Sequence, residues 1–232
     1  MTGDKKQESR RRADRLRAEH ERRGEPLLWF DALYKEAGGD PGLIPWGLQG
    51  GRQAARAPLI AWLDELPEDR RRGRALDVGC GLGDNAAALS RAGFEVTAFD
   101  ISPTAAEWAA QRFADLPISW AAANLLEPPS EWTGAFDLVS ETFTIQALQG
   151  GERLQAFRAL ASLVKPGGRL LIVCRGRLED EAESPPPWPL TPKELGSFET
   201  LGLRALPLRQ YFDKAEPPQR HFIAEFLRPS HP

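Results

Sequence analysis

The chain has 232 residues and a formal net charge of −3, with 30 Lys and Arg against 33 Asp and Glu. This length suits one α/β domain with added segments, and the charge balance gives no reason to expect a nucleic-acid partner. No apolar run approaches the roughly 20 residues that cross a bilayer, and the charged N-terminus lacks the apolar stretch of a secretory signal, so we expect a cytoplasmic protein without membrane contact.

The N-terminal part divides into a charged arm and an aromatic segment. Residues 1–24 are almost wholly charged, which predicts a solvated helix or a frayed arm. Residues 25–66 contain the run LLWFDALY, then a Gly- and Pro-rich stretch over 36–51, then a short amphipathic helix over 58–66. This segment is too apolar for a plain linker, so we expect it to form a lid or cap on the remaining domain, residues 67–232.

From residue 74 the chain alternates between apolar strands and helices. Ser102 is a suitable N-cap and Pro103 a suitable first residue for one helix, and a Pro-Gly-Gly turn ends another. Strands this apolar, separated by helices, indicate a parallel sheet covered on both faces. We predict strands at 74–79, 94–100, 118–124, 136–141 and 169–175, and helices at 85–93, 102–116 and 152–168.

Right-handed crossovers make this a doubly wound sheet, whose ligand crevice lies beyond the carboxyl ends of the strands, where the strand order reverses. An acidic, proline-rich insertion at 177–192 and a helix near 192–201 come next, followed by two alternating runs at 203–212 and 219–228. These two runs predict an antiparallel pair at the sheet edge. The predicted fold is therefore α/β, with a mostly parallel seven-stranded sheet and helices on both faces.

The strongest functional signal is LDVGCGLGDNA, residues 76–86, which leaves the first strand and enters a helix. Gly79, Gly81 and Gly83 let the backbone bend sharply and let a ligand approach without an intervening side chain. Asp77, at the end of the strand, offers a carboxylate to a positively charged ligand group. The spacing is Gly-x-Gly-x-Gly, which differs from the Gly-x-Gly-x-x-Gly of dinucleotide-binding loops.

This pattern resembles the glycine-rich motif of class I S-adenosylmethionine-dependent methyltransferases, and the resemblance extends over roughly residues 70–175. It implies a Rossmann-like methyltransferase fold with S-adenosylmethionine (S-adenosyl-L-methionine) as the cofactor. In that family the loop matching Gly79–Gly83, which includes Cys80, wraps the methionine part of the cofactor. The acid matching Asp77 helps to hold the cofactor's ammonium group.

Groups suited to a nucleoside follow the second and third strands. Asp100 closes the second strand about twenty residues after the loop, where a carboxylate can accept from both ribose hydroxyls. The resemblance implies that Ile101 packs on a face of the adenine. The family's usual acid after the third strand is replaced by Asn124, whose amide carbonyl can still accept from the adenine amino group. The backbone N–H of Leu125 is a second expected adenine contact.

Candidates for the acceptor site lie in three places. Glu141 and Thr142 follow the fourth strand and so face cofactor or substrate, and Glu141 is a candidate both for cofactor binding and for catalysis. Tyr34 and Trp46 resemble, in type and rough position, the aromatic lids of bacterial thiol, halide and thiopurine methyltransferases. This likeness makes both catalytic candidates, with simple packing as the other interpretation. His221, in the last strand, is interpreted as an edge-strand residue rather than a base.

These residues predict methyl transfer to a small molecule, most directly a thiol or another soft nucleophile, because a thiolate needs no strong base and none stands out. The alternative is N- or O-methylation of a small metabolite, with Glu141, Tyr34 or His221 as the polar partner. A non-catalytic cofactor-binding regulator and a nicotinamide dehydrogenase are rivals from other classes. A nucleic-acid methyltransferase is disfavoured, because SETF stands where an Asn-Pro-Pro-aromatic motif would follow the fourth strand.

Two further features limit the ligands. Cys80 and Cys174 show no Cys-x-x-Cys spacing, so we expect two reduced thiols and no metal site. The acidic insertion over Glu179–Glu183 is expected to repel an anionic acceptor. No pattern in the sequence predicts an oligomeric state.

Overall fold

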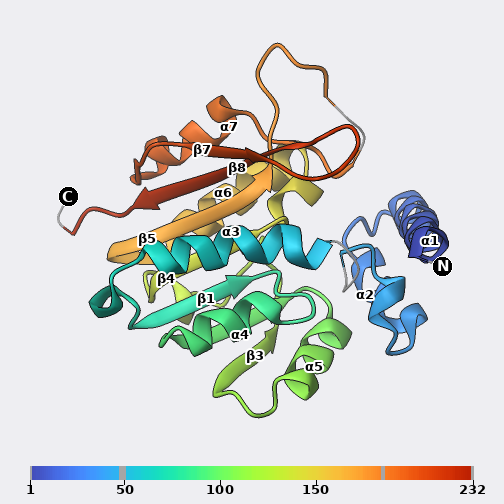
Figure 1. Cartoon of the computed structure of the whole chain (residues 1–232), viewed down its shortest axis with the longest axis horizontal. Coiled ribbons are helices and arrows are strands. Elements are labelled where there is room, and N and C mark those ends of the chain that lie inside the picture. Colours follow the sequence, from blue (N-terminus) through green and yellow to red (C-terminus); the bar gives the residue numbers. More distant parts are fainter. Residues whose placement is uncertain (1, 47–50, 184–185, 231–232) are drawn as a thin grey trace.

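The sheet forms the centre of the molecule (Figure 1). The computed structural model describes residues 2–46, 51–183 and 186–230, so residues 47–50 of the predicted lid and 184–185 of the insertion lie outside the described residues. The sheet order is β3-β2-β1-β4-β5-β8-β6, with β7 also paired to β8. The strands are β1 (Arg74–Val78), β2 (Glu95–Asp100), β3 (Ile118–Ala122), β4 (Phe136–Thr142), β5 (Val164–Arg175), β6 (Arg204–Ala205), β7 (Arg209–Phe212) and β8 (Arg220–Leu227).

The strand order reverses between β1 and β4, as the predicted doubly wound topology requires. β1 pairs in parallel with β2 on one side and with β4 on the other. Asp77 of β1 is the register partner of Ala98 in β2 and of Ser140 in β4. The carboxyl ends of β1 and β4 therefore border the crevice in which open α/β sheets bind ligands.

Helices cover both faces of the sheet. On one face, α3 and α4 bury Leu59, Trp62 and Leu89 together with Ala75 and Leu138 of the sheet. On the other face, α6, α7 and η5 enclose a larger apolar cluster. α5 packs on β2 and β3 on the same face as α4, because both right-handed crossovers run in the same direction along the sheet. The helices are α1 (Thr2–Arg22), α2 (Trp29–Ala37), η1 (Pro41–Leu43), α3 (Gly51–Glu65), η2 (Glu68–Arg70), α4 (Asp84–Arg91), α5 (Pro103–Arg112), η3 (Ser130–Trp132), η4 (Ile145–Ala147), α6 (Gly150–Leu163), α7 (Pro192–Gly196) and η5 (Ser197–Leu201).

The predicted fold class is confirmed, and two of the predicted boundaries near the sheet edge differ. The helix predicted over 152–168 ends at Leu163. The reason is that the Gly167 N–H donates to the carbonyl of Arg228 at 2.9 Å, which draws the Pro-Gly-Gly turn into β5. The run 203–212 forms two strands, because proline between them has no N–H to donate to the sheet. The sheet therefore has eight strands where seven were predicted, because one predicted strand is divided into β6 and β7.

The helix predicted over 58–66 begins earlier, at Gly51, so that Pro58 lies inside α3. Its Leu59 and Trp62 are buried in the core on the sheet. Part of the predicted 25–66 cap thus covers the sheet itself.

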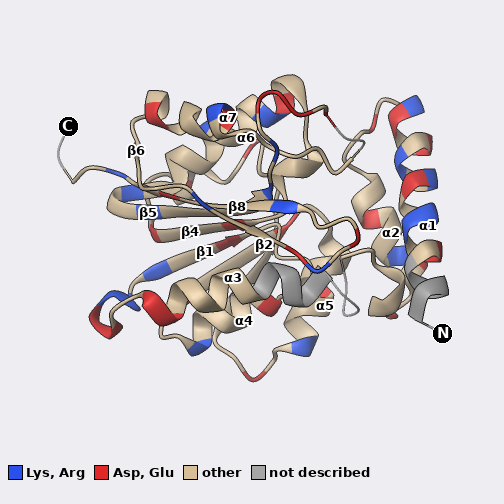
Figure 2. Ribbon diagram, turned by 45° about the horizontal axis from the view of Figure 1, so that its top comes forward, with Lys and Arg blue, Asp and Glu red and all other residues tan. Residues whose placement is uncertain are grey.

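The described N-terminal residues before position 47 form a smaller cluster beside the carboxyl ends of the parallel strands (Figure 1). The charged arm is the helix α1, and its Ala13 and Leu16 are buried in one cluster with Trp29 and Leu33 of α2. The rest of α1 carries bands of both charges (Figure 2). None of the helices in the described ranges is long and apolar enough to cross a membrane.

Candidate functional site

The glycine loop joins β1 to α4 at the reversal of strand order. Gly79, Gly81 and Gly83 have left-handed backbone angles, with φ of 64°, 52° and 82°. A Cβ at Gly79 would lie 2.2 Å from Thr144 Oγ1. A Cβ at Gly83 would lie 2.6 Å from Trp120 Cη2. Glycine is therefore required both by the loop's conformation and by the side chains packed against it.

Two aromatic side chains of the N-terminal cluster lie over this loop. A Cβ at Gly81 would lie 3.2 Å from Tyr34 Oη and 3.8 Å from Trp46 Cδ1. Trp46 Nε1 donates to Tyr34 Oη at 2.7 Å, and the Tyr34 ring meets that of Trp108 edge to face at 5.8 Å. Burial, and next the charge of Asp100, raise the pKa of Tyr34 well above its ordinary value. The two lid candidates thus adjoin the loop, and Tyr34 keeps its proton.

Asp77 lies beneath the loop and is 1% exposed. Among the described residues its Oδ2 has no hydrogen-bond partner. Burial raises the pKa of Asp77 to about 8; a hydrogen bond from the Ala86 backbone opposes this, and the charges of Asp100 and Glu141 add to it. A cationic group placed at Oδ2 would favour the ionised form.

Asp100 closes β2 and holds the loop through both of its oxygens. Oδ2 accepts from the Gly81 N–H and Oδ1 from the Ser102 N–H, each at 2.9 Å. Burial raises the pKa of Asp100 to about 6, against the effect of the hydrogen bonds from Ser102 and Gly81. Each oxygen retains a lone pair, so the carboxylate can still accept from a pair of ligand hydroxyls.

Glu141, at the end of β4, is fully buried. Its Oε1 accepts from the N–H of Thr144 at 2.5 Å and of Ile145 at 3.1 Å, while Oε2 has no partner in the described part of the chain. Burial raises the pKa of Glu141 to about 7, against those two hydrogen bonds. The turn that it caps contains Phe143, which has a positive φ of 64°. Glu141 therefore has a clear structural task besides any chemical one.

The N-terminus of α4 carries its own carboxylate. Asp84 is the first helical residue, and it pairs with Arg112 through two contacts of 3.2 and 3.3 Å. In dinucleotide-binding loops the pyrophosphate occupies this helix end. With Asp84 there, and with Asp77, Asp100 and Glu141 close by, the loop has a negative environment that opposes a bound diphosphate.

The ends of β2 and β3 adjoin the same crevice. The Ala123 N–H donates to the Asp100 carbonyl at 3.0 Å, which places Asn124 and Leu125 beside the aspartate. Asn124 Oδ1 accepts from the Leu126 N–H at 2.9 Å, so the amide shapes the turn and keeps one lone pair for a ligand. Leu125 is buried, whereas Ile101 is partly exposed.

Comparison with known proteins gives the family. The model of a family described as a methyltransferase domain matches residues 75–168. "Probable thiol methyltransferase 2" of Arabidopsis thaliana is 31% identical over 160 residues, which cover 67% of this chain and 66% of that protein. "Ubiquinone biosynthesis O-methyltransferase" of Xanthomonas campestris pv. campestris (strain 8004) is 32% identical over 101 residues, 43% of this chain and 41% of that protein. The chain thus spans less than two thirds of the length of either relative.

Among solved structures, the N-methyltransferase NodS from Bradyrhizobium japonicum WM9 in complex with S-adenosyl-L-homocysteine superposes with a TM-score of 0.65 at 20% identity. The superposition covers 85% of this chain and 97% of that one, and it shows the shared fold. Residues 75–168 therefore form a domain of the class I S-adenosylmethionine-dependent methyltransferase type. The family match begins in β1 and takes in the glycine loop and the Asp100 strand end.

The cofactor of this methyltransferase class carries a sulfonium and an ammonium group, and the site fits it. The unpartnered Oδ2 of Asp77 and Oε2 of Glu141 are buried acceptors near the loop. Buried carboxylates suit a cationic ligand and disfavour an anionic one. Within the described ranges, no group of three His, Cys, Asp or Glu side chains is placed to hold a metal ion.

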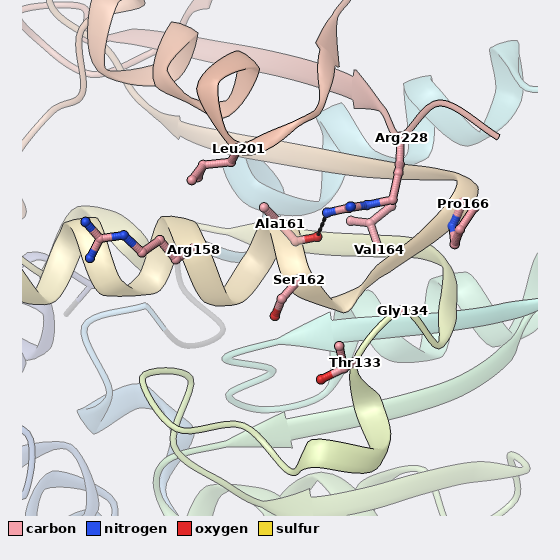
Figure 3. Close-up of a pocket in the computed structure, with 9 residues that line it drawn as sticks. All are labelled: Thr133, Gly134, Arg158, Ala161, Ser162, Val164, Pro166, Leu201 and Arg228. Carbon is pink, nitrogen blue, oxygen red and sulfur yellow. Dashed lines mark hydrogen bonds between the residues drawn. The ribbon is translucent and has the colours of Figure 1, made fainter. Parts of the chain in front are cut away.

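The structure also has a cavity of about 370 Å³ at the other end of the sheet (Figure 3). Arg228 Nη2 donates to the Ala161 carbonyl beside it at 2.5 Å. Since the cavity adjoins the amino ends of β4 and β5, the topology assigns ligand binding to the glycine loop instead. The cavity is lined by Thr133, Gly134, Arg158, Ala161, Ser162, Val164, Pro166, Leu201 and Arg228.

One residue beside the site, Asp31, was not predicted from the sequence. Asp31 of α2 accepts from Ser102 Oγ at 2.7 Å and from the Thr104 N–H at 3.3 Å, and it pairs with Lys35 Nζ at 2.7 Å. It therefore ties the helix that carries Tyr34 to the start of α5, directly after Asp100. Because Ser102 is 71 residues away in sequence, no local pattern marks Asp31.

Proposed function

We propose that the chain transfers the methyl group of S-adenosylmethionine to a small-molecule acceptor, most directly a thiol or another soft nucleophile. The observation that carries the proposal is the left-handed glycine loop, surrounded by buried carboxylates and covered by Tyr34 and Trp46. Such a site suits a cationic nucleoside cofactor and a reaction protected from water. The division into an arm at 1–24, a lid within 25–66 and a catalytic domain at 67–232 belongs to this proposal.

The cofactor-binding residues in this proposal are those of the crevice. Asp77 binds the ammonium group, and the loop of Gly79, Cys80, Gly81 and Gly83 surrounds the methionine part. Asp100 accepts from the ribose hydroxyls. Ile101, Asn124 and Leu125 contact the adenine. When bound, the cofactor supplies an electrophilic methyl group on sulfur, and the residues named here align and shield it.

The protein's part in the reaction is positioning, because a thiol acceptor needs no proton acceptor from the protein. Tyr34 keeps its proton, since burial raises its pKa. Glu141 Oε1 is occupied by two backbone amides. A thiol with a pKa of about 8.5 is partly ionised near neutral pH without help. A soft acceptor therefore fits this site better than an alcohol does. The named thiol methyltransferase among the relatives supports the same choice.

The second candidate function is N- or O-methylation of a small metabolite, and His221 is the observation that favours it. Its Nδ1 lies 3.1 Å from the Gln219 carbonyl, which accepts only and so holds the proton on Nδ1. Nε2 is then the unprotonated nitrogen of the neutral ring. Burial lowers the pKa of His221, which keeps the ring neutral at pH 7.

An acceptor screen separates the two candidates. We expect release of S-adenosylhomocysteine with 2-mercaptoethanol or iodide, and turnover that survives in His221→Ala. Inert thiols, together with turnover of an amine or phenol that His221→Ala abolishes, would establish the second candidate. Transfer of labelled methyl to none of the acceptors, in a protein that binds S-adenosylhomocysteine, would indicate a non-catalytic regulator.

A further inference from the structure

The edge of the sheet next to the proposed site carries a row of three polar and aromatic side chains. Arg175, the last residue of β5, is the register partner of His221 in β8, and His221 is the partner of Tyr211 in β7. Register partners lie on the same face of a sheet. The His221 ring stacks on Tyr211 at 4.8 Å, with an interplanar angle of 13°, and lies 5.4 Å from the ring of Phe143. Arg175 therefore lies at the carboxyl end of β5, next to the stacked rings of His221 and Tyr211.

This row lies on the same face of the sheet as polar residues of the proposed cofactor site. Asp77 of β1 is the register partner of Ser140 in β4, and Thr142, two residues further on, is the partner of Val173 in β5. Arg175 follows Val173 by two residues and so shares this face. Ser140 Oγ, Thr142 Oγ1 and Asp77 Oδ2 all lack a hydrogen-bond partner in the described chain. Arg175 is thus the next polar residue on this face beyond Thr142.

Arg175 has no ion-pair partner among the described residues, and the same holds for Arg10 and Arg177. Its side chain is partly buried, and burial, then the charge of Arg10 on α1, lower its pKa, while Asp213 opposes them. The Asp213 Oδ1 accepts from two backbone amides, of Ala215 at 3.0 Å and Gln219 at 2.9 Å. Several other arginines of the sheet and its helices are ion-paired, namely Arg153 with Glu194, Arg169 with Glu225, Arg209 with Glu65 and Arg220 with Glu181.

Two carboxylates of the acidic insertion have partners other than Arg175. Glu181 pairs with Arg220 at 2.9 Å, and its Oε2 accepts from the Leu178 N–H at 2.7 Å. Glu179 accepts from the Lys193 N–H at 2.9 Å. These two carboxylates of the insertion are thus engaged away from Arg175. A partly buried cation without a counter-ion is costly, and an anionic ligand group would relieve that cost.

We infer that Arg175 binds the negatively charged group of the methyl acceptor, so that the preferred acceptor is a small soft nucleophile that also carries a carboxylate. The stacked rings of Tyr211 and His221 form the wall on the far side of that group. This assignment rests on the proposed methyl transfer and narrows its substrate class. Guanidinium groups suit carboxylates because their fork of N–H donors matches the two oxygens.

Three thiols with the same two-carbon chain and end groups of different charge test the assignment, each compared at equal thiolate concentration: 3-mercaptopropionate, 2-mercaptoethanol and cysteamine. With the wild type we expect 3-mercaptopropionate to have the highest kcat/KM. Arg175→Met should lower that value about 10–100-fold, mainly through KM, because a hydrogen-bonded charge contact is lost. It should leave 2-mercaptoethanol within about twofold. Arg175→Lys should restore part of the preference, and the control Arg209→Met, an ion-paired arginine on β7, should change nothing.

Calorimetry of 3-mercaptopropionate with protein loaded with S-adenosylhomocysteine gives a readout that needs no turnover. If Arg175→Met loses this binding, the assignment of Arg175 is supported even when no thiol is methylated. In that case only the proposed methylation of thiols is refuted. If the three thiols are methylated at equal rates and Arg175→Met changes none of these rates, the assignment of Arg175 is overturned. The proposed methyl transfer is then still supported. Equal binding of 3-mercaptopropionate by the wild type and by Arg175→Met also overturns the assignment. Cofactor affinity and thermal unfolding confirm that each variant is folded.

Discussion

Asp100 has a structural task and, in the proposed function, also binds the ribose of the cofactor. It fixes Gly81 and Ser102 through their backbone amides and keeps one lone pair on each oxygen for the ribose. We expect Asp100→Ala to weaken binding of S-adenosylhomocysteine by about 2–4 kcal/mol, because two hydrogen bonds to a charged acceptor are lost. Isothermal titration calorimetry measures this. Unchanged affinity in a variant that unfolds cooperatively would remove Asp100 from the site.

If Asp77 binds the ammonium group as proposed, cofactor binding depends on pH. Burial raises its pKa to about 8, so at pH 6 the free protein carries a proton there that an ammonium ligand would displace. Affinity for S-adenosylhomocysteine should therefore increase as pH rises from 6 to 8, with release of up to one proton from Asp77. Calorimetry in buffers of different ionisation enthalpy counts that proton. Asp77→Asn should bind more weakly and lose this part of the pH dependence; an unchanged slope in the variant contradicts the assignment.

At the scale of elements, Asp31 connects α2 to the N-terminus of α5. Burial acts to raise its pKa, but hydrogen bonds from Lys35, Ser102 and Thr104 lower it to about 2. A lowered pKa means that this contribution to stability is present above about pH 4 and is lost as the pH falls towards 2. Asp31→Asn should lower the free energy of unfolding by about 1 kcal/mol, or about 2–4 °C in Tm. Asp14→Asn, which alters an exposed pair with Arg17, is the matched control, and an equal loss there contradicts the special role of Asp31.

The lid prediction is tested by truncation before α3, because Leu59 and Trp62 of that helix belong to the sheet core. Removing residues 1–24 should preserve turnover of 2-mercaptoethanol, although it uncovers part of the aromatic cluster of α2. Removing residues 1–46 should abolish turnover and retain some binding of S-adenosylhomocysteine, since Tyr34 and Trp46 are lost while the glycine loop remains. Full activity in the longer truncation would refute the lid.

The elements that the sequence predicted well are those determined by local periodicity. The five parallel strands and the Ser102 cap follow from neighbouring residues, and the Ser102 side chain does accept from the Ala105 N–H. Contacts between distant segments determine the features that were missed. The end of α6 depends on Gly167 and Arg228, and the burial of one side of α1 depends on α2. Hydrophobic patterning cannot reveal such pairings.

The same distinction between local pattern and distant contacts applies to the residues of the candidate site. The glycine loop and Asp100 lie in one continuous stretch whose spacing is informative. By contrast, Asp31 and the row of Arg175, His221 and Tyr211 come together only when the sheet forms. The interpretation of His221 as an edge-strand residue is wrong, because β8 is paired on both sides at this position, with Arg175 of β5 and with Tyr211 of β7. The register thus places His221 beside Arg175 at the crevice end.

For the molecule as a whole, the sheet places an acidic cofactor crevice and a basic edge side by side. The crevice contains Asp77, Asp100 and Glu141, and the edge presents Arg175. A cationic cofactor and an anionic, soft acceptor fit this division of charge. The central claim is that the acceptor is attacked as its own thiolate, with the protein supplying alignment and exclusion of water rather than a base.

The pH dependence of kcat/KM at saturating S-adenosylmethionine tests that claim most directly, with 2-mercaptoethanol compared against the more acidic 2,2,2-trifluoroethanethiol. If the acceptor ionises by itself, the rate rises with pH up to the pKa of each thiol, so the midpoint moves with the acceptor and is the same in the wild type and in Glu141→Gln. A midpoint that stays near pH 7 for both thiols, and that Glu141→Gln or His221→Ala removes, would contradict the account and assign the proton to a group of the protein.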